Sequence, residues 1–270
     1  MREKRLLITI LMFMILLLTG CGNIAASKSG AGDAPVIRVG CDTYPPYTYT
    51  GADGSPTGID IELAREAFRR MGYEPEFIYI DWEMKNELLD GNEIDCIWSS
   101  FSMDGREDQY RWAGPYMISR QVVAVRTDSA IYSLKDLEGC SVAVQVTTKP
   151  EEIFLGGEDE RIPELKNVIS LQNRELIYPS LSKGYVDAAA AHETSSRQYM
   201  KDYDVEYRIL DEPLLTVGLG VAFRKDDDRG IAEELSDTLE QMRMDGTEEQ
   251  IISEFIEDAD RYLEVEEYGK

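Results

Sequence analysis

The sequence predicts an α/β protein of two lobes, each built on a mostly parallel sheet flanked by helices, with a ligand cleft between the lobes. Short β-branched runs alternate with stretches of helical periodicity, a pattern typical of parallel sheets. The alternation occurs in two units joined by extended apolar runs. The 270 residues are 43% hydrophobic, which is enough to form the cores of two lobes of roughly 100–130 residues each.

The first unit begins with a β-branched run that ends in a loop rich in tyrosine and proline. Helical periodicity follows, and then a strand, a helix that stops at Gly91, and another strand. The expected strands are residues 36–40, 76–80 and 94–98, and the expected helices are residues 59–70 and 84–89.

An apolar run at residues 122–125 leads into the second unit. The expected elements are a helical turn at 134–137, a strand at 141–146, a helix at 177–183, strands at 186–191 and 218–223, and two acidic amphipathic helices at 228–244 and 247–262. Because ligands of open parallel sheets lie beyond the carboxyl ends of the strands, we expect the site in the loops that follow the strands.

The charge balance excludes one class of partner. The chain has 52 acidic and 28 basic residues, a formal net charge of -24, so it is unsuited to the phosphate backbone of a nucleic acid. The 15 tyrosines and the aromatic content of 9% are too high for a disordered acidic segment. The acidic residues therefore indicate the solvated surface of a folded protein.

The start of the chain has the pattern of a secretory signal peptide, which we expect over residues 1–20. Basic residues precede an apolar run at 6–18, which is shorter than the ~20 residues of a membrane-spanning helix. The run closes in Leu18-Thr19-Gly20-Cys21, which resembles the bacterial lipobox. This resemblance implies cleavage before Cys21, diacylation of its thiol, and anchoring to the outer face of the cytoplasmic membrane. An ordinary signal peptide or an uncleaved anchor is the alternative.

Residues 21–34 are rich in Ser, Gly and Ala and lack apolar periodicity, so we expect a flexible tether there. Three further cysteines, Cys41, Cys96 and Cys140, lack the spacing of metal ligands, and we expect no metal and no cofactor. Their apolar surroundings favour buried thiols, although a bond between Cys41 and Cys96 is conceivable if their strands are neighbours.

Short motifs follow one another along the chain. They are YPPY at 44–47, DG at 53–54, GIDIELA at 58–64, GNEID at 91–95, GPY at 114–116, LKDLEG at 134–139, GYVDA at 184–188 and DGT at 245–247. In these motifs and their order, over residues 36–255, the chain resembles the family 3 extracellular solute-binding proteins, the polar amino acid receptors of ABC importers.

The resemblance implies the type II periplasmic-binding-protein-like fold. Lobe 1 would comprise residues 35–121 and 222–270, and lobe 2 would comprise residues 126–216. The hinge strands would be residues 122–125 and 217–221. Ligand groups would bridge the lobes, so that binding favours the closed state by the contacts made only there.

Members of the family hold an α-carboxylate with an arginine after the third strand and with nearby hydroxyl groups. The matching residues here are Ser99, Ser100, Ser102 and Arg106. A planar guanidinium makes two parallel charge-assisted hydrogen bonds to a carboxylate, which lysine cannot reproduce. The loop is one residue shorter than usual, so Arg111 is the alternative to Arg106.

The resemblance also assigns aromatic walls to the cleft and hydroxyl contacts to the second lobe. The matching residues are Tyr44, Tyr47 and Trp82, with Phe101 as a further candidate, for the walls, and Thr147 and Thr148, with Lys149 beside them, for the second lobe. Trp98 lies within an apolar strand, so we expect it in the core.

One position departs from the family pattern. Where the family has an aspartate that pairs with the α-ammonium of the ligand, this chain has His192, its single histidine. A neutral imidazole is a weaker and pH-dependent partner for an ammonium. Either Glu193 replaces the aspartate, or the alignment slips by one residue, or the ligand is not a standard α-amino acid. Asp42, just after the first strand, is another carboxylate that can face a ligand cation.

We therefore expect a monomeric, lipid-anchored receptor that binds a small polar solute, by resemblance an amino acid, and passes it to the permease subunits of an ABC importer. Such a receptor is not an enzyme. Two alternatives stay open. One is a sensor that signals to a membrane partner, and the other is a dehydratase or lytic enzyme on the same fold, in which His192 and Glu193 would form an acid–base pair.

Overall fold

A nine-stranded sheet organises residues 34–265, the part of the chain that the computed structural model describes. Its strands are β1 (Val36–Cys41), β4 (Glu74–Tyr79), β5 (Cys96–Ser102), β6 (Arg111–Arg126), β7 (Ser141–Gln145), β8 (Asn167–Leu171), β9 (Ala188–His192), β10 (Tyr207–Ile209) and β11 (Leu215–Phe223). The predicted signal peptide, Cys21 and residues 21–33 of the tether lie outside the described residues. Within 34–265, no helix is long and apolar enough to cross a membrane.

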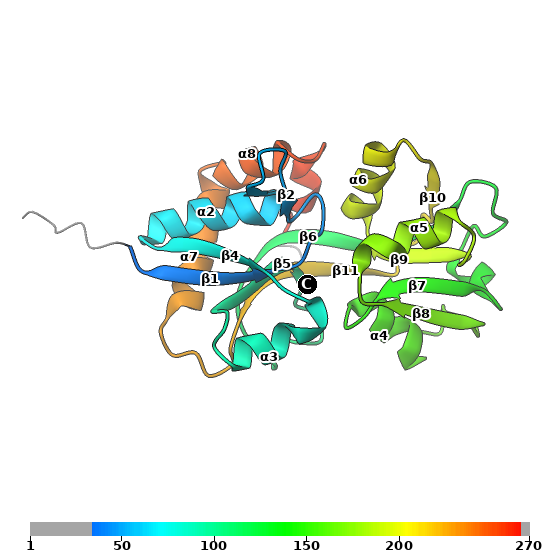
Figure 1. Cartoon of the computed structure of the whole chain (residues 1–270), viewed down its shortest axis with the longest axis horizontal. Coiled ribbons are helices and arrows are strands. Elements are labelled where there is room, and N and C mark those ends of the chain that lie inside the picture. Colours follow the sequence, from blue (N-terminus) through cyan, green and yellow to red (C-terminus); the bar gives the residue numbers. More distant parts are fainter. Residues whose placement is uncertain (1–33, 266–270) are drawn as a thin grey trace, which may run out of the picture. The chain divides into compact units, whose positions relative to one another are not determined.

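Two groups of parallel strands flank the long antiparallel pair β6 and β11 (Figure 1). In the first lobe, β1 runs parallel to β4 and β5; in the second, β7 runs parallel to β8 and β9. Strand β6 pairs with β11 as far as Gln121, and from Gln121 onward it pairs with β9. The predicted two-lobed α/β class is therefore confirmed, and Gln121 marks the point where β6 passes from one partner to the other.

The helices of the first lobe are α2 (Ile59–Met71), α3 (Lys85–Asp90), α7 (Ile231–Met244) and α8 (Thr247–Ser253), and a short hairpin of β2 (Tyr49–Thr50) and β3 (Pro56–Thr57) lies beside α2. Helix α2 buries Ala64, Ala67 and Phe68, whose i, i+3, i+4 spacing places them on one side of the helix. The ring of Phe68 lies 5.9 Å from that of Trp98, centroid to centroid. Trp98 is buried in this core, as predicted.

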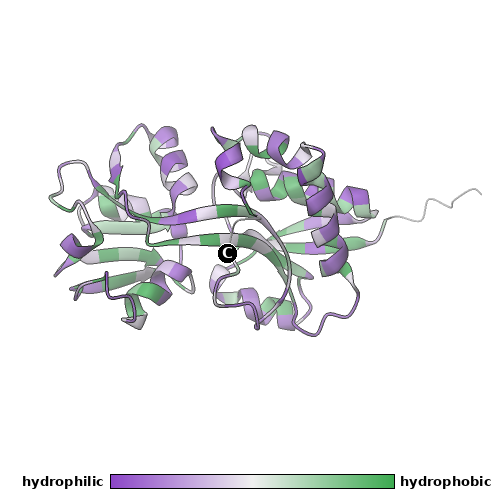
Figure 2. Ribbon diagram, turned by 180° about the vertical axis from the view of Figure 1, so that it is seen from behind, coloured by the Kyte–Doolittle hydropathy of each residue, from purple (hydrophilic) through white to green (hydrophobic). Residues whose placement is uncertain are grey.

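The helices of the second lobe are α4 (Lys149–Gly156), α5 (Ile177–Ser182) and α6 (Glu193–Tyr203), and its short 3-10 turns are η2 (Leu134–Leu137) and η3 (Arg174–Leu176). Its core includes side chains from β6, β7 and β9, among them Val123, Val142 and Ala190. Figure 2 shows apolar residues concentrated on the strands and hydrophilic residues on the outer surfaces of the helices.

The prediction of one continuous helix at 247–262 is wrong. Helix α8 ends at Ser253, and a separate 3-10 turn, η4 (Ala259–Tyr262), follows it. Glu254 and Glu257 add negative charge where the carboxyl end of the helix already carries partial negative charge, which opposes extension of the helix. Asp258 then takes the left-handed conformation, which starts the separate turn.

Several elements lie outside the predicted pattern, namely the first part of β6, strands β8 and β10, and helices α4 and α6. Strand β6 contains Gly114 and Pro115, which the sequence marks as a turn. Helix α6 buries Thr194, Ser195 and Ser196 in place of apolar side chains. Its buried face is polar, so hydrophobic periodicity could not reveal it.

The cysteines of the described residues are free thiols. Cys41 and Cys96 lie buried on the neighbouring strands β1 and β5, and Cys140 is partly exposed. The conceivable bond between Cys41 and Cys96 is therefore not formed. Burial raises the pKa of the Cys41 thiol to about 12, so this group stays protonated and unreactive.

Candidate ligand-binding site

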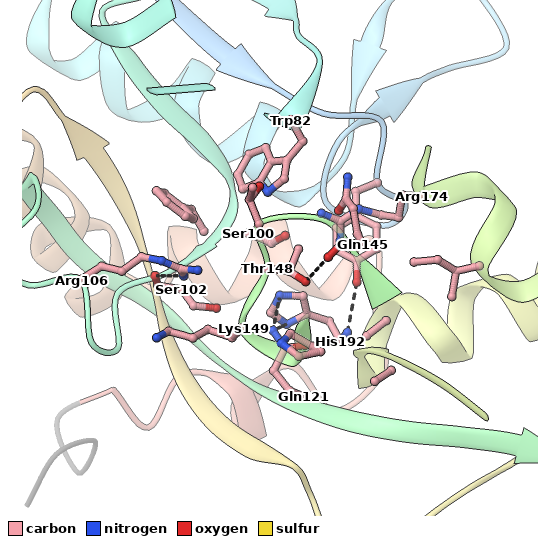
Figure 3. Close-up of a pocket in the computed structure, with 17 residues that line it drawn as sticks. Trp82, Ser100, Ser102, Arg106, Gln121, Gln145, Thr148, Lys149, Arg174 and His192 are labelled. Carbon is pink, nitrogen blue, oxygen red and sulfur yellow. Dashed lines mark hydrogen bonds between the residues drawn. The ribbon is translucent and has the colours of Figure 1, made fainter. Parts of the chain in front are cut away.

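A polar pocket lies where loops of the two lobes meet beside β6 (Figure 3). The first lobe contributes Tyr44, Trp82 and the loop after β5, and the second lobe contributes the loop after β7, Arg174 and the end of β9. Most of these segments follow the carboxyl ends of strands, where a ligand site was expected. The cavity that remains between the side chains has a volume of about 20 Å³, room for about one water molecule.

The pocket brings together most of the predicted ligand-binding residues. Those that line it are Tyr44, Trp82, Ser100, Ser102, Arg106, Thr147, Thr148 and His192, together with Phe101 and Lys149. Those that lie beside it without lining it are Asp42, Tyr47, Ser99 and Glu193. Three polar lining residues were not predicted: Gln121, Gln145 and Arg174. Gln145 is the last residue of β7 and the next-to-last residue of the strand predicted at 141–146, so the rule that sites follow strand ends could have found it.

The loop after β5 is held in place by a buried carboxylate. Ser100 has a positive φ of 46°, and its backbone N–H donates to Asp60 Oδ2 at 2.6 Å. Tyr116 donates its hydroxyl to the other oxygen of Asp60 at 2.9 Å. Burial raises the pKa of Asp60 to about 7, against the effect of these two donors. Asp60 therefore fixes the conformation that turns the Ser100 side chain toward the pocket.

Arg106 extends from this loop along the wall of the pocket. Its guanidinium carbon lies 5.1 Å from the centroid of the Phe101 ring, and its Nη1 donates to Ser102 O at 3.2 Å. Burial lowers the pKa of Arg106, because little water solvates the charge. The alternative, Arg111, does not line the pocket and lies 3.4 Å from Glu233. The shorter loop therefore still places Arg106 at the pocket.

A second cationic group bridges the lobes behind the pocket. Lys85 Nζ donates to Thr147 Oγ1 at 2.7 Å and lies 4.9 Å from the centroid of the Trp82 ring. Burial lowers the pKa of Lys85 to about 8, and the charges of Arg106 and Arg174 act in the same direction. On the second lobe, Lys149 Nζ pairs with Glu152 at 2.7 Å.

Asp42 faces the second lobe rather than the cavity. Its Oδ2 accepts hydrogen bonds from Gln145 Nε2 at 2.8 Å and from Arg174 Nε at 3.3 Å. The guanidinium carbon of Arg174 lies 3.4 Å from the centroid of the Tyr44 ring. Asp42 is thus used in a contact between the lobes, which explains why it does not line the pocket. Ser99 is similarly occupied, since its Oγ accepts from Asp42 N at 3.1 Å.

The His192 ring, at the end of β9, is held by hydrogen bonds to Ser119 and Gln121. Its Nδ1 lies 2.8 Å from Ser119 Oγ, and its Nε2 lies 2.9 Å from Gln121 Nε2. An amide N–H can only donate, so the ring accepts it in the neutral form. Burial lowers the pKa of His192 to about 3, and the charge of Arg174 contributes. Tyr47 lies behind the ring, where its hydroxyl contacts Thr194 Oγ1 at 2.6 Å.

Glu193 turns away from the pocket. It begins α6, and its carboxylate pairs with Arg120 at 3.0 Å and with Arg197 at 2.5 Å. The Glu193 side chain is 4% exposed, and the two ion pairs compensate its buried negative charge. Glu193 therefore does not replace the aspartate that the resemblance led us to expect at His192.

Four buried polar atoms at the pocket have no hydrogen-bond partner among residues 34–265. They are Trp82 Nε1, Ser100 Oγ, Gln121 Oε1 and Gln145 Oε1. Buried polar groups in folded proteins are nearly always paired. These atoms are two acceptors, one donor and one hydroxyl that can do either, so they suit a ligand with polar groups of both kinds.

Replacing His192 by Gln is expected to flatten the pH dependence of stability. In the unfolded chain this residue takes up a proton near its ordinary pKa of 6.5, but in the folded protein only near 3. The unfolded state therefore binds more protons between these values, and the free energy of unfolding falls as the pH falls. From pH 8 to pH 5 this loss is about 2 kcal/mol. Urea denaturation at both pH values measures it; equal losses in both proteins would contradict the prediction.

Comparison with known proteins gives one consistent result. A family model described as bacterial extracellular solute-binding proteins, family 3, matches residues 37–258. The histidine-binding periplasmic protein of Salmonella typhimurium is 29% identical over 260 residues, which cover 91% of this chain and 95% of that protein. The arginine-binding extracellular protein ArtP of Bacillus subtilis is 28% identical over 254 residues, which cover 92% of this chain and 96% of that protein. A solved substrate-binding protein of an ABC uptake transporter from Streptococcus pneumoniae, with bound histidine, has a similar fold, with a TM-score of 0.76 and a sequence identity of 24%. The similarity covers 83% of this chain and 94% of that one.

Proposed function

The chain belongs to the bacterial extracellular solute-binding proteins, family 3, and on this premise we propose that it captures a small polar solute of amino-acid size between its lobes and delivers it to an ABC importer. The observation that carries the proposal is the polar pocket that both lobes line. The match covers 95% and 96% of its relatives named for the binding of histidine and of arginine. We also propose that the lipid on Cys21 anchors the receptor outside the cytoplasmic membrane, and that the receptor acts as a monomer.

Capture by lobe closure is supported by the size of the cavity and by the contacts around it. A volume of about 20 Å³ is too small for an amino acid, so the lobes have to part to admit a solute. Lys85 reaches Thr147 across the cleft at 2.7 Å, Gln172 reaches Glu83 at 2.7 Å, and Gln145 reaches Asp42 at 2.8 Å. These polar contacts are exchanged for water on opening, so each contributes modestly to the closed state.

The hinges proposed for this motion lie at residues 122–125 of β6 and 217–221 of β11. Strand β6 changes its partner from β11 to β9 at Gln121, next to the first of these segments. The register between β11 and β6 shifts at Gly220, inside the second segment. A change of partner and a bulge are both places where a strand can bend with little loss of ladder hydrogen bonds.

A binding role fits the chemistry of the pocket better than an acid–base reaction. His192 is neutral, with its pKa lowered to about 3 by burial, and Glu193 is paired with two arginines outside the pocket. The pair that the enzymatic alternative needs is therefore not assembled, since a general acid–base residue works best with a pKa near the working pH.

The proposal is tested with the full chain expressed in bacteria and purified from membranes in detergent. A bound solute raises the melting temperature by mass action, so the protein is melted in the presence of amino acids, organic acids, polyamines, peptides and sugars. One class of small polar solute should raise the melting temperature in a saturable manner. Stabilisation by none of them would contradict a solute-binding role. An unmodified Cys21 in the mass spectrum of the amino-terminal peptide would contradict the anchor.

A further inference from the structure

The pocket carries an excess of positive charge. Arg106, Lys149 and Arg174 line it, and none of the described residues that line it is Asp or Glu. Lys85 lies directly behind, with its ammonium near the Trp82 ring. Positive charges this close repel any cationic group of a ligand and attract anionic ones, and the effect is strong where little water screens them.

The carboxylates around the pocket lie outside its lining and are engaged with other groups. Asp42 bonds to Gln145 and Arg174, and Glu152 pairs with Lys149 at 2.7 Å and lies 3.7 Å from Arg106. Glu151 accepts from Thr147 N, and Asp60 accepts from Ser100 N. These carboxylates offset part of the positive charge, but none of them lines the pocket. The pKa of Lys85 is lowered first by burial and then by the charges of Arg106 and Arg174, which exceed the opposite effects of Glu151 and Glu83.

The usual partner for a ligand ammonium is missing as well. His192 stands at the position where an aspartate was expected, and its ring is occupied by Ser119 and Gln121. Glu193, the next carboxylate along the chain, pairs with Arg120 and Arg197 outside the pocket. An ammonium buried here would lack a charged partner, which is costly.

The pocket offers two separate guanidinium groups and neutral acceptors between the lobes. Arg106 and Arg174 lie on opposite sides of the group of lining residues (Figure 3), and each can bind one carboxylate. The amide oxygens of Gln121 and Gln145 are buried and unpaired within the described residues. They suit an uncharged donor, such as a hydroxyl group.

We propose that the solute of this receptor is a small hydroxylated dicarboxylate without an ammonium group, held by Arg106 and Arg174 at its two ends and by Gln121 and Gln145 at its hydroxyl. This inference rests on the proposed receptor function and narrows its solute. The charge of the pocket and the unpaired amide oxygens both favour this class over a zwitterionic amino acid.

Malate and aspartate test the proposal directly, because they share one carbon skeleton and differ in a hydroxyl against an ammonium. Their affinities for the full chain in detergent are measured by calorimetry at pH 7.5, with tartrate, citrate, succinate, glutamate, histidine and arginine as further probes. We expect malate or another hydroxy acid to bind at least tenfold more tightly than aspartate. Tighter binding of aspartate or any other amino acid would overturn the proposal and leave the receptor function standing. Binding of no solute in the wider screen would overturn both.

The matched variants are His192→Asp and His192→Asn. His192→Asp restores a carboxylate at the pocket, so it should weaken malate binding by tenfold or more and bring the ratio of the two affinities toward aspartate. His192→Asn changes the shape of the side chain in a similar way but adds no charge, and should keep the preference for malate. An unchanged ratio in a folded His192→Asp protein would overturn the proposal. If that variant does not fold, the ratio in the unaltered protein decides alone.

Discussion

Arg106→Ala is expected to weaken solute binding by about 2–4 kcal/mol, which is the loss of a charge-assisted, bidentate contact in a buried site. Arg106 is largely buried at the wall of the pocket, where burial lowers its pKa. Its guanidinium stacks near Phe101, and one of its amino groups bonds to Ser102 O. Other amino groups remain for a ligand carboxylate. Calorimetry with the solute that stabilises the protein measures the loss.

Arg111→Ala is the matched control for this experiment. Arg111 follows Arg106 by five positions and pairs with Glu233 at 3.4 Å, away from the pocket. Its side chain is partly exposed, so the ion pair adds little to stability. We expect the control to bind with unaltered affinity. If Arg111→Ala weakened binding as much as Arg106→Ala, the carboxylate would be held elsewhere than the pocket indicates.

Much of the site could be predicted because its residues follow strands that the sequence reveals. Tyr44 follows β1, and Ser100, Ser102 and Arg106 lie at or just after the end of β5. Strand ends of a parallel sheet meet at one edge, so residues far apart in the sequence converge there without any further information. The motifs that the family shares added Thr147 and Thr148 by their order along the chain.

Arg174 could not be found in this way. It lies in a short 3-10 turn after β8, a strand whose residues are half exposed and give no clear apolar pattern. Its role depends on Asp42 and Tyr44, which lie on the other lobe. A contact between lobes depends on how the two cores are oriented, and no local pattern in the sequence encodes that orientation.

The alternatives at His192 and Glu193 were open for a similar reason. Adjacent residues at the end of a strand point in different directions, so only one of the two side chains can face the pocket. The choice depends on where β9 ends and α6 begins, and on Arg120 and Arg197, which hold Glu193. The sequence shows the residues, but the boundary is set by tertiary contacts.

Gly58→Ala is expected to destabilise the protein by about 3–5 kcal/mol, as the sum of backbone strain and a steric clash. Gly58 precedes α2 with a φ of 120°, a conformation that is essentially restricted to glycine. A Cβ at this position would lie 2.6 Å from the carbonyl carbon of Tyr47 and 2.8 Å from Pro46 O. Both atoms belong to the backbone, so they cannot rotate away. Urea denaturation measures the loss.

The clash at Gly58 would reach the ligand site through two hydrogen bonds. Ile59 N donates to Pro46 O and Asp60 N donates to Tyr47 O, both at 3.0 Å. The loop that carries Tyr44 is thus joined to the turn of α2 that carries Asp60, which in turn holds Ser100. Weaker solute binding should therefore accompany the loss of stability, even under conditions where the variant is folded.

Gly54→Ala separates the clash from the strain. Gly54 also has a positive φ, of 85°, but a Cβ there would have no atom within 4 Å. This variant should lose only the strain energy of about 1–3 kcal/mol and should bind the solute as the unaltered protein does. Equal destabilisation by both alanines would mean that the loop of residues 44–48 yields to the added methyl group. Gly58 lies against the backbone of that loop. We therefore expect the Gly58→Ala variant to be the less stable of the two and to bind the solute more weakly.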